Sequence, residues 1–134
     1  MSITLHNITG APAPQNYSHA TSARGDTIVH ISGQVGTDEN GEVVAGGLAA
    51  QAERAMLNVA LALEAAGAGV EDIAKTTLYV VDWDPSMFEE FARGAEAARQ
   101  QYPFPNAALT LIGVKSLFTP EMLIEIEAVA VVES

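Results

Sequence analysis

Two glutamates near the C-terminus have the spacing best suited to acid–base chemistry. Glu125 and Glu127 alternate with apolar residues, so a strand here carries both carboxylates on one face. Two residues along a strand span about 6.5–7 Å, within the separation of the paired carboxylates that hydrolyse sugars. A single tryptophan leaves few platforms for sugar rings. Two other interpretations stay open: a polar strand face paired to Arg or Lys, or one buried glutamate that donates a proton or orients water.

Patterns for nucleophilic or metal catalysis are missing from the sequence. The chain has no cysteine, which excludes a thiolate nucleophile, disulfides and cysteine-ligated metals. His30 and Ser32 share one face of a predicted strand, but no acid lies at a spacing that suggests a catalytic triad. His6 and His19 do not combine with His30 into a metal-binding spacing. We therefore predict neither a metal nor a cofactor.

Six basic residues are the available partners for a carboxylate or phosphate substrate. Lys75 and Lys115 lie at the ends of predicted strands, where they could face a cleft. Arg24 falls in a predicted turn and is expected to be solvated. On predicted helices, solvation or pairing with an acid four residues away is the simpler interpretation. This applies to Arg54, Arg93 and Arg99.

Composition narrows the class of protein and its partners. The chain has 134 residues, 49% apolar and 17% charged, which suits one domain over residues 1–134. Its net charge of −11 repels nucleic acid and anionic membranes, so we expect neither as a partner. No apolar run reaches the roughly 18 residues of a membrane span, and residues 1–6 lack the features of a signal peptide. We expect a cytoplasmic protein.

Hydrophobic periodicity predicts an α+β domain of order β-β-β-α-β-α-β-β, a sheet with two helices packed on one face. Asn40-Gly41 marks a hairpin-type turn, and Gly67 or Gly69 offers a C-cap for the first helix. A strand at 27–32 is expected to close on Gly33. The other strands are expected at 3–8, 73–82, 107–114 and 122–132, and the helices at 48–66 and 86–101.

Five segments, in order along nearly the whole chain, carry a resemblance to a known family. They are Pro14-Gln15-Asn16-Tyr17-Ser18-His19-Ala20, Ser32-Gly33-Gln34-Val35-Gly36, the helical Gln51, Asn58 and Leu61, the stretch from Asp72 to Asp82, and Ile124-Glu125-Ile126-Glu127-Ala128-Val129-Ala130. Together they resemble the RidA/YjgF family of small enamine/imine deaminases. No single motif is decisive, but the set is specific.

The resemblance implies a chorismate-mutase-like fold and a homotrimer with small-molecule clefts between subunits. Family members hydrolyse reactive enamines or imines, such as 2-aminoacrylate, to 2-oxo acids and ammonia. A glutamate on the last strand positions water or protons, and Glu125 occupies that place. The family's tyrosine corresponds to Tyr17, and its serine-glycine pair to Ser32 and Gly33.

The chain departs from the family where an arginine should clamp the substrate carboxylate. Ala107 stands at that place in the Pro-x-Arg segment, a cleft asparagine aligns near Ala92, and no arginine follows residue 99. A carboxylate in a partly dry cleft needs such a partner. We therefore predict an imine or enamine hydrolase whose substrate is not 2-aminoacrylate. Backbone groups near Gly33 and Ala107 would hold the polar end, and Lys115 is the first candidate to replace the clamp. The alternative is a trimeric ligand-binding or regulatory protein without turnover.

Overall fold

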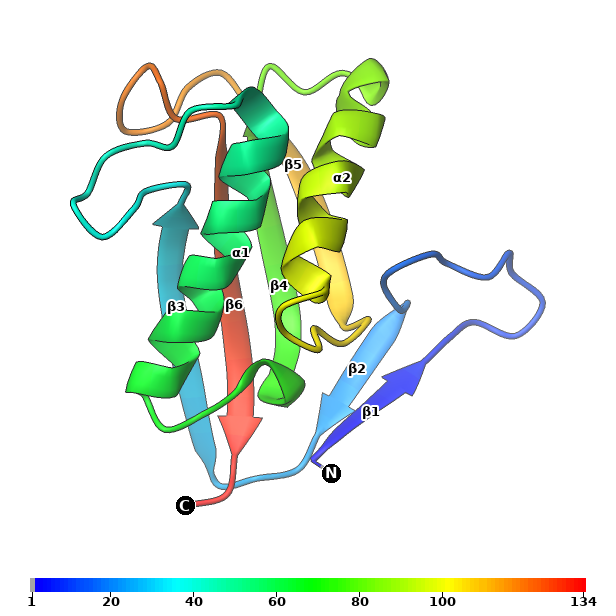
Figure 1. Ribbon diagram of the computed structural model, residues 1–134. Helices are drawn as coiled ribbons and strands as arrows, with labels where there is room; N and C mark the ends of the chain where they lie inside the picture. The colour runs from blue at the N-terminus through cyan, green and yellow to red at the C-terminus, as the bar shows by residue number, and fades with distance from the viewer. Residues whose placement is uncertain (1) are drawn as a thin grey trace.

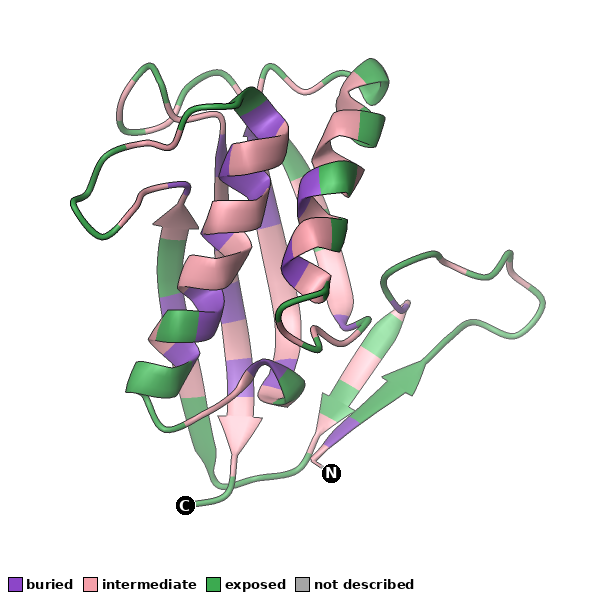
Figure 2. Cartoon of the chain, viewed as in Figure 1, coloured by how far each residue is buried: buried purple, intermediate pink, exposed green. Residues whose placement is uncertain are grey.

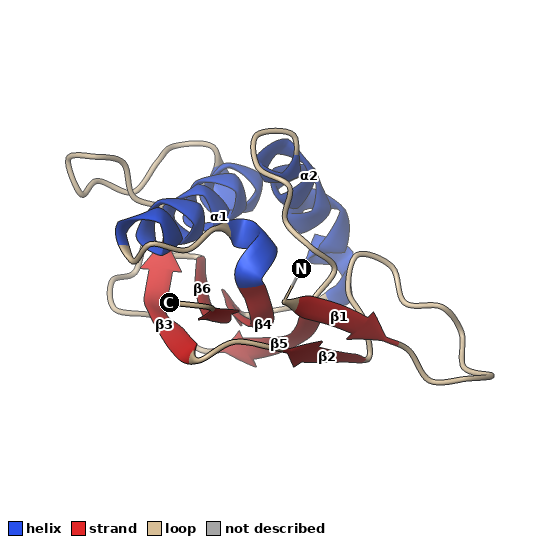
Figure 3. Cartoon of the chain, turned by 90° about the horizontal axis from the view of Figure 1, so that it is seen from below, coloured by secondary structure: helices blue, strands red, loops and turns tan. Residues whose placement is uncertain are grey.

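A four-stranded sheet carries both helices on one of its faces (Figures 1 and 3). The computed structural model describes residues 2–134. The strands are hydrogen-bonded in the order β3 (Thr27–Val35), β6 (Ile124–Val132), β4 (Ile73–Val81) and β5 (Ala108–Val114). β6 runs antiparallel to both neighbours, whereas β4 and β5 are parallel. The remaining elements are the ribbon of β1 (Ile3–His6) and β2 (Ala20–Ala23), the helices α1 (Gly47–Ala65) and α2 (Phe88–Arg99), and short 3-10 turns at Val70–Asp72 and Pro85–Met87. The predicted α+β class, element order and one-sided helical layer are confirmed.

Two strands differ from the sequence-based expectation. The second strand is β2, in a small and polar stretch without alternation, and it forms by pairing with β1 from His6↔Ala20 to Ile3↔Ala23. β3 does not close on Gly33 but continues to Val35 through a register irregularity between Ile31 and Gln34. Pairing with the long β6 keeps the strand extended past the glycine, and the irregularity absorbs the extra residue.

The core lies between the sheet and the helices, as the buried residues in Figure 2 show. The inward residues of β6 are at most 2% exposed: Ile124, Ile126, Ala128 and Ala130. α1 packs Val59 and Leu63 against them, at 2% and 0% exposure. Burying side chains of this size stabilises the fold by about 1.5–3 kcal/mol each. The alternation of buried apolar residues with half-buried residues along β6 therefore determines which face of the sheet the helices cover.

Glycines allow the two helices to approach each other closely and allow α1 to terminate. A Cβ on Gly94 of α2 would collide with the Ala49 carbonyl of α1, so the helices cross in close contact there. Glu90 of α2 also accepts a hydrogen bond from the Ala49 backbone N–H at 3.3 Å. α1 ends at Ala65, and Gly67 follows the cap residue Ala66 with a φ of 79°, which permits Ala68 N–H to bond the Leu63 carbonyl at 2.9 Å. The predicted glycine C-cap of α1 is confirmed. The contacts with Ala49 of α1 hold α2 in place above the sheet.

Two amides of α1 that carry the family resemblance have structural partners. The Gln51 side chain is 4% exposed, donates to the Glu121 carbonyl at 3.0 Å and accepts from Leu123 N–H at 2.8 Å. The Asn58 amide donates to the carbonyls of Val35 and Thr37, both at 2.9 Å. These bonds tie the loop before β6 and the end of β3 to the helix.

The second face of the sheet carries no helix. Its residues on β6 are half-buried, including Glu125 and Glu127. Ile28 of β3 and Ile112 of β5 are 63% and 40% exposed. This open face combines exposed apolar groups with two carboxylates. Within residues 2–134, no helix has the length and apolar character needed to cross a membrane.

Two leucines on α1 provide a matched test of the core. Leu63 is fully buried and Leu61 is 47% exposed. We expect Leu63→Ala to lower the free energy of unfolding by about 2–5 kcal/mol, because it leaves a cavity against the sheet. Leu61→Ala should stay within about 0.5 kcal/mol of the wild type. Urea denaturation followed by circular dichroism measures both changes, and equal losses would contradict the packing described here.

Candidate functional site

Glu125 lies on the open face, with its carboxylate directly over the backbone of Gly33. A Cβ added to Gly33 would collide with the Glu125 carboxylate, which shows how closely the two residues approach. In the sheet, Glu125 is paired with Val35 on one side and Tyr79 on the other. The structure thus brings together the predicted residues Glu125, Ser32 and Gly33, because Ser32 lies in the same irregular part of β3. Glycine is needed there for space, since its φ is not in the left-handed region.

Glu127 has a different environment, although it shares the face. The Tyr79 hydroxyl donates to its carboxylate across β4 and β6 at 2.5 Å. This hydrogen bond, with smaller contributions from partial burial and the charges of Glu127 and Glu125, raises the pKa of the Tyr79 phenol. The polar partner is a tyrosine, and not the Arg or Lys that the strand pattern suggested. Of the two glutamates, Glu127 is thus engaged with a phenol, while Glu125 faces the glycine backbone.

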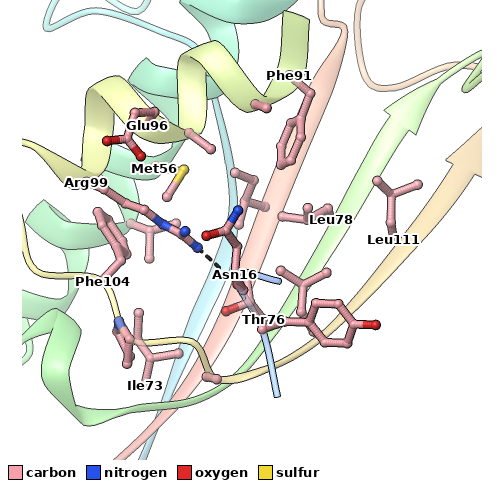
Figure 4. Close-up of a pocket in the computed structure, with 18 of the residues that line it drawn as sticks. Asn16, Met56, Ile73, Thr76, Leu78, Phe91, Glu96, Arg99, Phe104 and Leu111 are labelled. Atoms are coloured by element: carbon pink, nitrogen blue, oxygen red, sulfur yellow. Dashed lines mark hydrogen bonds between the residues drawn. The ribbon is translucent and has the colours of Figure 1, made fainter. Parts of the chain in front are cut away.

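Two other predicted residues, Tyr17 and Ala107, lie on the helical side, at a cavity between α2 and the sheet (Figure 4). Its volume is about 410 Å³. Tyr17 is 37% exposed, Ala107 is 4% exposed, and both line this cavity. Ser18 N–H bonds the Ala107 carbonyl at 3.4 Å, which holds the Tyr17 segment against the start of β5. The apolar lining includes Met56, Ile73, Leu78, Phe91, Phe104 and Leu111.

Arg99, at the C-terminal end of α2, reaches this cavity and supplies its only cation within residues 2–134. Its Nη2 donates to the Asn16 carbonyl at 3.1 Å, and its Nε is buried without a hydrogen-bond partner. Partial burial lowers the pKa of the guanidinium, an effect that the nearby Glu96 carboxylate opposes. Asn16 has a φ of 67°, a conformation that asparagine tolerates better than most residues.

Arg99 is not among the predicted site residues, because solvation or pairing with an acid four residues away is the simpler interpretation of an arginine on a predicted helix. The available signal was the pair Ala92 and Ala95, seven and four residues earlier on the same helical face. Small side chains at those positions leave room on the inner side of α2, and both line the cavity. A long side chain one turn later can therefore fold inward.

One copy of the chain separates the predicted residues into two groups. In the sheet, Ala108 pairs with Lys75, and Lys75 with Val129, four residues along β6 from Glu125. Strand spacings then place Glu125 about 16 Å from the start of β5. Lys115 is exposed beyond the other end of β5, about 26 Å along the strand from Ala107. Glu125 thus lies far from the Tyr17–Ala107 group, and so does Lys115.

The described residues contain no cluster suited to a metal ion. Within residues 2–134, no group of three or more histidine, aspartate or glutamate side chains has the arrangement that would hold one. The groups near the predicted site residues that could bind or react with a ligand are the carboxylate of Glu125, the guanidinium of Arg99, the Tyr17 phenol and backbone amides.

Comparisons with known proteins match nearly the whole chain. The family described as Endoribonuclease L-PSP matches residues 8–132. The 2-iminobutanoate/2-iminopropanoate deaminase of Homo sapiens is 34% identical over 123 residues, covering 91% of this chain and 82% of the relative. A RutC family protein of Pyrococcus abyssi is 32% identical over 122 residues, covering 90% of each. The crystal structure of a protein of unknown function of the conserved Rid protein family from Yersinia pestis superposes with a TM-score of 0.85 at 34% identity, covering 98% of this chain and 100% of the other.

The hydrogen bond between Tyr79 and Glu127 predicts that the Tyr79 phenol loses its proton at a more alkaline pH than an ordinary tyrosine. The pKa of Tyr79 should lie above the ordinary 10.0, and Glu127→Gln should lower it by removing the negative acceptor. A pKa raised by folding stabilises the protein fully below the unfolded pKa, and this contribution is lost as pH rises through the folded pKa. Near-ultraviolet absorbance titration measures the ionisation of the phenols, and Tyr79→Phe identifies the step at high pH that belongs to Tyr79. An identical titration in wild type and Glu127→Gln would contradict the bond.

Proposed function

The chain belongs to the RidA/YjgF family, and from this membership we propose that it hydrolyses the C=N bond of a small reactive enamine or imine to a carbonyl compound and ammonia. The observation that carries the proposal is the carboxylate of Glu125 held over Gly33 on the open face. Glu125 corresponds by resemblance to the family's proton-handling residue, and its carboxylate lies beside the backbone of Gly33, which corresponds to the glycine of the family's serine-glycine pair. The relative named as a 2-iminobutanoate/2-iminopropanoate deaminase supports the reaction class.

The chemistry requires one group that moves protons in both directions. In the proposed reaction the Glu125 carboxylate accepts a proton from water as the oxygen attacks the imine carbon. The protonated Glu125 then gives this proton to the nitrogen, which produces a carbinolamine. Glu125 next takes the proton of the new hydroxyl group and passes it to the nitrogen, so that the C–N bond breaks and ammonia leaves as the C=O bond forms. An enamine first gains a proton at its β-carbon and becomes the imine. Water is the only co-reactant, so the proposal needs no metal or cofactor.

Ala107 makes 2-aminoacrylate an unsuitable substrate in this proposal. The methyl side chain of Ala107 provides no charge for the carboxylate of a substrate held at Glu125, and within one copy Arg99 lies on the opposite side of the sheet from Glu125. Desolvating that carboxylate without a partner is costly. We expect 2-aminoacrylate to be hydrolysed at close to its spontaneous rate. Lys115 lies too far along β5 to supply the clamp within one copy.

The proposed assembly is a homotrimer whose small-molecule clefts lie between copies. Two observations support it: the open face exposes Ile28 and Ile112, and the site residues of one copy fall into two separated groups. A neighbouring copy on the open face would cover the apolar groups and could bring the Tyr17 group of one chain to Glu125 of another.

A ribonuclease activity, which the family description names, is disfavoured by charge. The net charge of −11 repels a phosphate backbone.

Glu125 is tested by substitution with an amide of the same shape. We expect Glu125→Gln to keep the fold and lower the rate of imine hydrolysis by about 10²–10⁴, because the amide cannot transfer the proton. The assay measures carbonyl product and ammonia from a panel of imines generated in situ, relative to the spontaneous rate. Glu127→Gln is the matched control, and its smaller effect follows from the bond to Tyr79.

The outcomes of that assay separate the two candidate functions. Equal rates for wild type and Glu125→Gln on a substrate that is turned over would remove Glu125 from the mechanism. If no imine of the panel reacts faster than spontaneously, the hydrolase proposal is wrong and the protein is better described as a ligand-binding member of the family.

The assembly is tested by mass. Light scattering at micromolar concentration should give about three times the chain mass of 14.0 kDa. Substituting an exposed residue of the open face, Ile112→Glu, should shift the protein toward monomer, because it buries a charge in an apolar contact. Leu61→Glu on the helical side is the control and should leave the mass unchanged. A monomeric wild type would contradict the trimer and the shared clefts.

A further inference from the structure

The cavity between α2 and the sheet combines an apolar interior with one partly buried cation. We propose that it is a binding site within a single subunit for a small carboxylic acid with a branched or aromatic apolar group, whose carboxylate pairs with Arg99. The site borders Tyr17 and Ala107 but does not contain Glu125. The inference therefore does not depend on the proposed hydrolysis.

The size and lining of the cavity suit the apolar part of such a ligand. Its volume of about 410 Å³ lies in the range of small-molecule pockets, which is roughly 300–1,000 Å³. Figure 4 shows Leu78 and Leu111 on the sheet and Phe91 on α2 around this space. Aliphatic and aromatic walls of this kind favour a ligand with several carbon atoms over acetate.

Small side chains on α2 are the reason that the space exists. Ala92 and Ala95 line the cavity from above, between the larger Phe91 and Arg99. Gly94 is held against Ala49 of α1, so the helix is braced by its neighbour rather than by side chains filling the space beneath it. A larger residue at Ala95 would occupy the cavity without removing Arg99.

Arg99 provides the recognition of charge. One nitrogen donates to the Asn16 carbonyl, while Nε is buried without a partner, so the guanidinium retains donors for an acceptor in the cavity. Partial burial also costs the guanidinium some of its hydration, and a carboxylate would compensate for that loss. Figure 4 shows the guanidinium next to Asn16.

Glu96 limits the number of negative charges that the site accepts. It lines the same cavity, and its charge opposes the effect of burial on Arg99, but no ion pair within 4.0 Å joins them among residues 2–134. A second anionic group on the ligand would meet this carboxylate and the net charge of −11. A monocarboxylate therefore fits better than a dicarboxylate or a phosphate ester.

The binding experiment uses stable acids that cannot react. Isothermal titration of the wild type should show 4-methylpentanoate and 3-phenylpropanoate binding at least tenfold more tightly than acetate, since each buried methylene contributes about a fourfold gain. The uncharged 4-methylpentanamide should bind at least tenfold more weakly than its acid, because it lacks the charge-assisted bond. This comparison needs no variant, so it holds even where a substitution affects folding.

Three substitutions assign the site. Arg99→Gln should weaken 4-methylpentanoate at least tenfold, whereas Arg93→Gln, at an exposed arginine of the same helix, should leave its affinity unchanged. Ala95→Leu should abolish binding of the bulky acids by filling the cavity, with Arg99 intact. Circular dichroism checks that each variant is folded.

Three results would overturn the inference: no binding of either bulky acid to the wild type at millimolar concentration, equal affinity for the acid and its amide, or unchanged affinity in folded Arg99→Gln. Glu125→Gln distinguishes this inference from the proposed function. It should retain full affinity for 4-methylpentanoate, because Glu125 projects from the opposite face of the sheet. Loss of turnover with retained binding would support both proposals, and retained turnover with lost binding would overturn both.

Discussion

The alternation of β6 is the constraint on which the rest of the structure depends. This strand is paired on both sides, with β3 and β4, so its register is set by two ladders at once. Its inward residues, from Ile124 to Ala130, form the floor of the core, and its outward residues include Glu125 and Glu127. A slip of one residue would turn two carboxylates into the core and expose the isoleucines, at a cost of several kcal/mol. The packing that stabilises the fold therefore also determines where Glu125 points.

Small residues then decide where functional groups find space. Because Gly33 has no side chain, the Glu125 carboxylate can lie against the strand, and because Gly94 has none, α1 can pack closely against α2. Ala92 and Ala95 leave the cavity into which Arg99 extends. At Gly33, and at Ala92 and Ala95, the missing side-chain atoms, rather than an added interaction, create the environment of a charged group. These positions contribute little to the hydrophobic core and much to the arrangement of the chemistry.

The parts of the fold that could be predicted from sequence are those set by local periodicity. The strict alternation of residues 124–130 and the Ala- and Leu-rich helix at 48–66 indicated their elements correctly, because burial follows the same repeat as the backbone. β2 could not be found this way, since it depends on pairing with β1 and not on its own side chains. Arg99 was missed for a related reason: the room it occupies is made by α2, β4 and β5 together. Glu125 was indicated by the alternation of the last strand and Lys115 by its place at the end of a predicted strand. The other predicted site residues were found through family resemblance, which gives correspondence along the chain but not the face of the sheet.

The separation of Glu125 from Arg99 follows from the pleat of a single strand. Ile126 lines the cavity, and its neighbour Glu125 projects from the opposite face of β6. With about 16 Å between Glu125 and the start of β5, a ligand that fits the cavity cannot contact both charges in one copy. The side chains of Arg99 and Glu125 share no contact, so changes at the two positions should act independently within a subunit. Any coupling between the two positions would thus have to pass through a second copy of the chain. A double-mutant cycle of Arg99 and Glu125 therefore tests whether a neighbouring subunit brings its Glu125 to the cavity. An additive cycle would place the two charges in separate sites, and a strongly non-additive one would place them in the same intersubunit cleft.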